Sequence, residues 1–134
     1  MSALPVKKSA ALQRCLNSPY LSVDDSKQSQ VQNEFAAARD YYQQAVSSFK
    51  GNDEATGLKR VWSVMFRCAR ALAYKAGYKV EQLHCLEVVL LEHYPKQITQ
   101  DDIGQLRQAQ ELLGPPDAAL NRAQSFMKKA SALA

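Results

Sequence analysis

Two stretches that share one apolar spacing constrain this chain most. In each, apolar residues recur at alternating intervals of four and three positions, which places them on one face of an α-helix. A turn of about four residues separates the two helices, so we expect an antiparallel hairpin with a shallow crossing angle. The first set is Val31, Phe35, Ala38, Tyr42, Ala45 and Phe49, and the second is Leu58, Trp62, Met65, Ala69, Leu72 and Ala76.

The second of these helices carries signals at both ends. The run from Gly51 to Glu54 supplies a helix breaker, a capping side chain and two acids, and acids suit the positive end of a helix dipole. Gly77 can take the left-handed conformation that ends a helix at little cost. We therefore predict one long helix from near Asn52 to Gly77.

The remaining segments also predict helices, because no segment alternates apolar and polar residues as a strand does. We predict an all-α fold, an up-and-down bundle of four to five main helices. The bundle forms a single domain over residues 1–134, with its core in about 26–132 and residues 1–8 loose. The other predicted helices are Ala10 to Leu16, about Ser26 to Lys50, about Val80 to His93, Thr99 to about Leu113 behind a capping box, and Asp117 onward.

Composition narrows the function classes. The net charge of +4 and the pI of about 9.0 favour an anionic partner, nucleic acid above all. Cys15, Cys68 and Cys85 are three isolated thiols with neither zinc spacing nor a disulfide framework, so we expect a reduced, cytoplasmic compartment. No apolar run is long enough for a membrane span, and no phosphate loop or metal motif predicts a cofactor.

A basic strip is the first candidate site. Arg60, Arg67, Arg70 and Tyr74 lie opposite the apolar face of the long helix, and no acid occurs between Glu54 and Glu81. Arginine binds phosphate through two parallel hydrogen bonds, and a tyrosine ring can stack on a base. The strip therefore predicts a nucleic-acid-binding surface. The alternative is a solvated face, or one closed by acids from Asp24, Asp25 or Glu34.

His84 is the candidate for chemistry. A histidine can act as a general acid or base near neutral pH, and Lys79, five positions earlier, could steady a phosphate beside it. The alternative is that His84 caps or packs the first turn of its helix. We expect this second arrangement and assign no catalytic residue.

The segment from Trp62 to Tyr78, followed by His84 and Cys85, resembles the core of small prokaryotic HEPN-domain proteins. Their pattern there is roughly YYAMFHAARALLxxKGY, then a few residues and a histidine. The segments 36–42 and 119–126 also suit the family's first and last long helices, so the resemblance covers about residues 26–132. It implies a helical bundle that is usually a symmetric dimer.

Many HEPN proteins are metal-independent ribonucleases, often toxins paired with a nucleotidyltransferase-like antitoxin or parts of phage defence. Their nuclease motif is an arginine, four to six residues, then a histidine. This chain departs from it, because the window before His84 holds Gly77, Tyr78 and Lys79, and Arg107 has no histidine after it. Lys79 lacks the planar fork of arginine.

We therefore expect a HEPN-like homodimer that binds RNA, another nucleic acid or a protein partner without doing chemistry, in a toxin–antitoxin or defence setting. The first alternative is an endoribonuclease toxin that uses His84 and Lys79. The second is a purely structural dimerisation module that buries Val88–Leu91 between chains.

Overall fold

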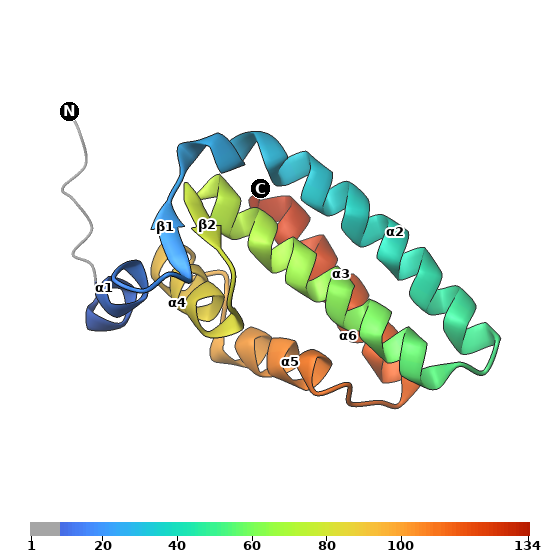
Figure 1. Ribbon diagram of the computed structural model, residues 1–134. Helices are drawn as coiled ribbons and strands as arrows, with labels where there is room; N and C mark the ends of the chain where they lie inside the picture. The colour runs from blue at the N-terminus through green and yellow to red at the C-terminus, as the bar shows by residue number, and fades with distance from the viewer. Residues whose placement is uncertain (1–8) are drawn as a thin grey trace.

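The computed structural model describes residues 9–134, so the predicted looseness of residues 1–8 lies outside the described residues. This part of the chain is mostly helical, with six α-helices packed together, one 3₁₀-helix and two short strands (Figure 1). In chain order they are α1 Ala10–Leu16, β1 Leu21–Val23, η1 Asp25–Gln30, α2 Val31–Lys50, α3 Glu54–Lys75, β2 Tyr78–Val80, α4 Leu83–His93, α5 Gln100–Gln110 and α6 Pro116–Leu133.

The predicted hairpin of two long helices is confirmed. α2 and α3 run antiparallel along most of their length, and α6 lies along α3 as well (Figure 1). Small side chains line these contacts and let the helix axes approach closely. Fully buried alanines occur on all three helices: Ala38 and Ala45 on α2, Ala69, Ala71 and Ala73 on α3, and Ala119, Ala123 and Ala130 on α6.

The ends of α3 follow the predicted signals with one shift. The cap is Asp53, not Asn52, and its carboxylate accepts a hydrogen bond from the Thr56 backbone N–H at 3.2 Å. Asn52 instead takes a left-handed backbone with φ of 61°. At the other end Gly77 has φ of 91°, the conformation that glycine adopts without a Cβ clash.

The prediction of a chain without strands is wrong. β1 and β2 form an antiparallel pair in which Leu21 faces Val80 and Val23 faces Tyr78. Two further backbone bonds extend the pairing, from Asp24 N–H to Gly77 C=O at 2.8 Å and from Glu81 N–H to Tyr20 C=O at 3.0 Å. Three-residue strands are too short to show an alternating pattern, which is why the sequence did not reveal them.

Two predicted helices begin later than expected, because the residues before them belong to other short elements. The segment Asp25–Gln30 is a 3₁₀-helix that turns the chain from β1 into α2, so the α-helix begins at Val31 and not near Ser26. Val80 belongs to β2, and α4 begins at Leu83.

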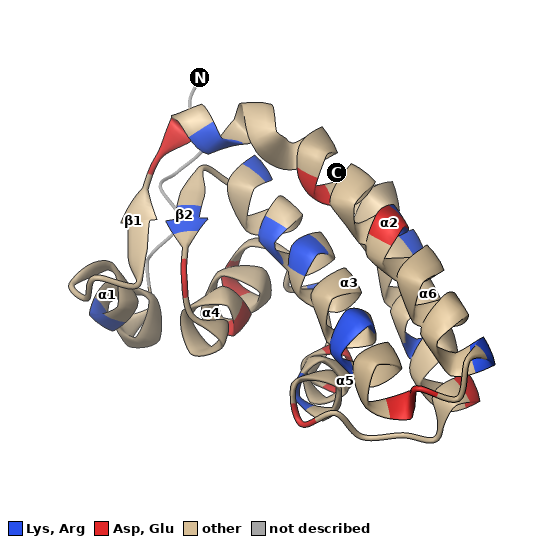
Figure 2. Cartoon of the chain, turned by 45° about the vertical axis from the view of Figure 1, so that its right-hand side comes forward, with Lys and Arg blue, Asp and Glu red and all other residues tan. Residues whose placement is uncertain are grey.

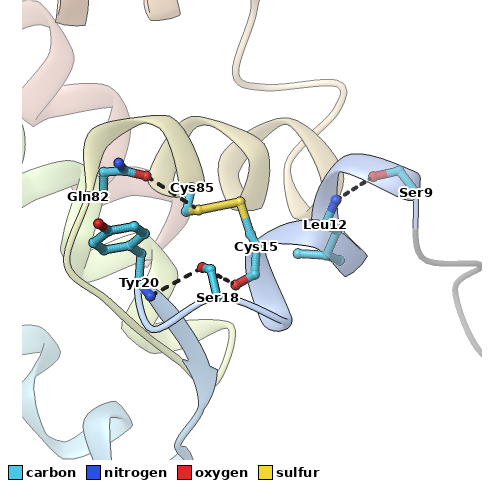
Figure 3. The surroundings of a disulfide bond; sticks show 7 residues. All are labelled: Ser9, Leu12, Cys15, Ser18, Tyr20, Gln82 and Cys85. Atoms are coloured by element: carbon cyan, nitrogen blue, oxygen red, sulfur yellow. Dashed lines mark hydrogen bonds between the residues drawn. A yellow bond between two sulfur atoms is a disulfide. The ribbon is translucent and has the colours of Figure 1, made fainter.

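The prediction of three isolated thiols is also wrong. A disulfide joins Cys15 of α1 to Cys85 of α4, and only Cys68 is free among the described residues (Figure 3). The pairing of β1 with β2 accounts for the bond, because it sets the ends of α1 and α4 side by side. The expected reduced, cytoplasmic compartment rested on free thiols, so it loses that premise.

The predicted capping box of α5 is confirmed. The Thr99 hydroxyl accepts from the Asp102 N–H at 3.2 Å, and the Asp102 carboxylate accepts from the Thr99 N–H at 2.9 Å. Lys129 of α6 donates to the same carboxylate at 2.9 Å, which ties α5 to α6. Burial alone would raise the pKa of Asp102, but the bonds from Lys129 and Thr99 hold it below the ordinary value of 3.8.

We expect Asp102→Asn to lower the free energy of unfolding by about 1 kcal/mol at neutral pH, because the bonds from Lys129 and Thr99 lose a charged acceptor. A carboxyl group with a lowered folded-state pKa stabilises the fold above its unfolded pKa of 3.8, and this contribution disappears as the pH falls through the folded pKa. Urea denaturation at several pH values should therefore show the two proteins converging in acid, as the pH falls below the ordinary pKa of 3.8.

Asp101→Asn is the matched control, since Asp101 is exposed in the same helical turn. Its effect should be less than half as large. A difference between Asp102→Asn and the unsubstituted protein that persists unchanged in acid would show that the carboxylate charge is not what stabilises this corner.

A membrane-spanning helix is not found in residues 9–134, where each helix is too short or too polar for that role.

Candidate nucleic-acid interface

The polar side of α3 carries repeated basic residues. Figure 2 shows Lys and Arg along this helix, with an acidic residue only at its start. Arg60, Arg67 and Arg70 are each half-buried, because α2 packs beside them. Lys59, near the start of the helix, is exposed. The three predicted arginines therefore share one side of one helix.

Arg67 and Arg70 contact the same carboxylate. Glu34 of α2 is only 6% exposed. It accepts a short hydrogen bond from Arg70 at 2.8 Å and longer ones from Arg67 at 3.3 and 3.4 Å. A buried carboxylate needs such cationic partners, because its charge has left water. The sequence left open whether these arginines face solvent or pair with an acid. The structure shows Arg67 and Arg70 paired with Glu34.

The electrostatics of this cluster favour the charged form of Arg67. Burial alone would lower the pKa of Arg67, but Glu34 and Tyr41 raise it above its ordinary value. One polar atom, Nε of Arg70, is buried without a hydrogen-bond partner in the described structure. Two guanidinium groups facing one carboxylate leave one positive charge in excess.

Four side chains on α3 form a ladder with a spacing of four residues: Trp62, Phe66, Arg70 and Tyr74. The Trp62 and Phe66 ring centroids are 5.3 Å apart, and the Arg70 guanidinium lies 5.2 Å from Phe66 and 5.6 Å from Tyr74. Side chains four apart on a helix are neighbours, so this spacing was the signal that could have identified the ladder. We assigned Trp62 to the inward face and did not single out Phe66.

The far end of the ladder is closed to stacking. Tyr74, which we expected to stack on a base, is 7% exposed, and Lys27 lies 5.9 Å from its ring centroid. Burial raises the pKa of its hydroxyl group above the ordinary value, while Arg70 acts in the opposite sense. Trp62 and Phe66 at the other end are half-buried and retain contact with solvent.

Arg60 belongs to a second group, with Tyr41 of α2. The guanidinium groups of Arg60 and Arg67 each lie 5.7 Å from the centroid of the Tyr41 ring. Arg60 forms no ion pair with any residue in 9–134. It lines an open hollow of about 390 Å³ together with Asp40, Thr56 and polar residues of α2. This arginine is the best placed of the three to meet an external anion.

The structure does not bring Lys79 and His84 into contact. Lys79, on β2, pairs with Glu81 at 3.4 Å. His84 is exposed in the first turn of α4 and lines a hollow of about 390 Å³ with Glu87 and Arg107. Arg107 donates two hydrogen bonds to the buried Glu87 carboxylate, at 2.7 and 3.1 Å. An arginine thus does lie near His84, but it comes from α5 and is already paired.

In the same described residues, no three His, Cys, Asp or Glu side chains converge closely enough to hold a metal ion. Comparison with known proteins finds no matching family model, no matching curated protein and no matching solved structure. The expected homodimer and nucleotidyltransferase-like partner stay predictions. Val89 and Leu90, which one alternative buried between chains, lie inside this chain's own core.

Proposed function

We propose that this protein is a non-catalytic, HEPN-like helical protein that binds RNA along the α2–α3 side of the bundle. The observation that carries the proposal is the excess of cationic charge there. Arg67 and Arg70 share the single carboxylate of Glu34, and Arg60 has no ion-pair partner among the described residues. Exposed Lys59 adds to this charge. Such a surface attracts the phosphate backbone of a nucleic acid.

The three arginines have different contacts, and we assign them different roles. Arg67 and Arg70 hold the buried Glu34 and so join α2 to α3, while their remaining charge contributes to the surface potential. Arg60 lies over the Tyr41 ring and lines an open hollow beside Asp40, where it can donate to a phosphate. Structural and binding roles therefore coexist on one helix face.

The HEPN-like part of the proposal rests on the resemblance and on where its segments lie. The segments 36–42, 62–78 and 119–126 fall mainly on α2, α3 and α6, which pack together, whereas His84 and Cys85 lie on α4. An up-and-down HEPN-like bundle and a homodimer follow from that resemblance. They remain part of the proposal, as does a toxin–antitoxin or defence setting.

We expect Arg60→Gln to weaken RNA binding about fivefold at an ionic strength of about 0.1 M, because one phosphate contact is lost. The slope of log binding constant against log salt should become shallower by roughly 0.7, the value for one contact on a single strand. Fluorescence anisotropy of a labelled RNA, measured over a salt series, gives both quantities.

Arg14→Gln is the matched control, because it removes the same charge from the exposed side of α1, which packs against α4. Its binding should match that of the unsubstituted protein. Equal losses in the two variants would mean that net charge alone attracts RNA, and the assigned interface would be wrong.

A second candidate, an endoribonuclease, is favoured by one observation: His84 and Arg107 line the same hollow. Under the first proposal the labelled RNA stays full-length during the binding assay. Cleavage that His84→Ala abolishes would replace the first proposal with this one.

A further inference from the structure

The ladder on α3 combines aromatic rings with a guanidinium group. Trp62 and Phe66 are large aromatic side chains, half-buried beside the core, and they continue directly into the cationic pair of Arg70 and Arg67. Aromatic rings beside guanidinium groups are the chemistry that receives unpaired bases together with their phosphates. We infer that the α3 face binds single-stranded RNA, with bases stacking on Trp62 and Phe66 while the arginines attract the backbone. This inference rests on the proposed RNA-binding function and deepens it.

The spacing of the ladder selects a single strand. The Trp62 and Phe66 ring centroids are 5.3 Å apart, whereas bases in a duplex strand repeat every 3.4 Å or so. Two neighbouring bases can therefore meet Trp62 and Phe66 only after they separate from each other. A duplex holds its bases stacked and paired, so their faces are closed to these rings.

The charges around the ladder suit this occupant as well. Arg70 lies between Phe66 and Tyr74, and Arg67 lies between Glu34 and the Tyr41 ring. Both guanidinium groups are held in place before any ligand arrives, so little side-chain entropy is lost on binding. Lys59 stands one turn before the first ring of the ladder and is exposed. A chain of phosphates passing along α3 would meet positive charge at each end of the ring pair.

Trp62 is the only tryptophan in the protein, so its fluorescence reports on this site alone. The test is a titration of the full chain with a short oligoadenylate and with the duplex of that strand and its oligouridylate complement. We expect the single strand to quench the tryptophan fluorescence and to bind about tenfold more tightly than the duplex.

Trp62→Leu should weaken binding of the oligoadenylate about tenfold, measured by anisotropy of the labelled strand, because leucine keeps an apolar contact with the core but cannot stack. Trp62→Phe keeps a ring and should restore most of the affinity. It also keeps the test decisive if the leucine variant folds poorly, which circular dichroism would reveal. Tyr20→Leu is the matched control, since Tyr20 is 45% exposed on the β1 side of the fold.

The outcomes separate the two proposals. If neither RNA binds, the proposed function itself fails. If single strand and duplex bind equally and tryptophan fluorescence does not change, RNA binding stands and the stacking inference is overturned. A loss for Tyr20→Leu equal to that for Trp62→Leu would also overturn it.

Discussion

Replacing Cys15 and Cys85 with serine is expected to lower the free energy of unfolding by about 4 kcal/mol. The bond joins residues that lie 70 positions apart, so in the unfolded chain it closes a long loop and removes much of the chain's conformational entropy. Both cysteines are buried, at 4% and 2% exposure, so their replacement also places two hydroxyl groups in an apolar setting. Guanidinium chloride denaturation measures the change.

A reductant provides the control. It should destabilise the unsubstituted protein to about the level of the double variant and leave the variant itself unaffected. If the reductant does not change the denaturation midpoint of the unsubstituted protein, Cys15 and Cys85 are not bonded in solution. In the folded protein Cys68 does not compete with the disulfide, because burial raises the pKa of its thiol to about 12 and keeps it unreactive.

Glu34→Gln is expected to change stability and RNA affinity in opposite directions. Stability should fall by about 2 kcal/mol, since Arg67 and Arg70 lose the anion that compensates their partly buried charges. RNA affinity should rise about fivefold at an ionic strength of about 0.1 M, because the freed charge becomes available to phosphate. Urea denaturation and anisotropy titration of the same preparation measure the two effects.

Glu81→Gln makes the same charge change at an exposed pair with Lys79 and should leave stability nearly unchanged. It shows how much of the affinity gain comes from net charge alone. A Glu34→Gln variant that is less stable but binds RNA no more tightly would show that Arg67 and Arg70 serve packing only, and the interface would shrink to Arg60 and its neighbours.

The long helices were predictable because their apolar spacing repeats over several turns. The spacing of the α2 and α3 faces identifies both helices and their antiparallel contact, and the capping box at Thr99 marks the start of α5. The sequence did not reveal features that consist of a few residues and form only when segments far apart in the chain come into contact. β1 and β2 have three residues each, and neither has a pattern until it is paired.

In the candidate site, too, the positions along one helix were predictable and the contacts between helices were not. The arginines of α3 could be placed on one face from their spacing, but the partner that holds two of them comes from α2. Glu34 was one of several acids that could have served, and its choice depends on how α2 rotates against α3. Trp62 fits the inward spacing of α3, yet the structure leaves it half-buried beside Phe66, because the edge of an apolar face is shared between core and solvent.

The position of Cys15 and β1 has a consequence for biosynthesis. Ribosomes deliver a chain from its N-terminus, so α2 and α3 emerge consecutively and can associate through contacts that are local in sequence. The residues before them must wait, since Leu21 pairs with Val80 and Cys15 with Cys85, both of which are translated after α3. The segment from α1 to β1 can thus dock only after α3 is complete, and a nascent polypeptide halted before β2 would carry this segment unattached.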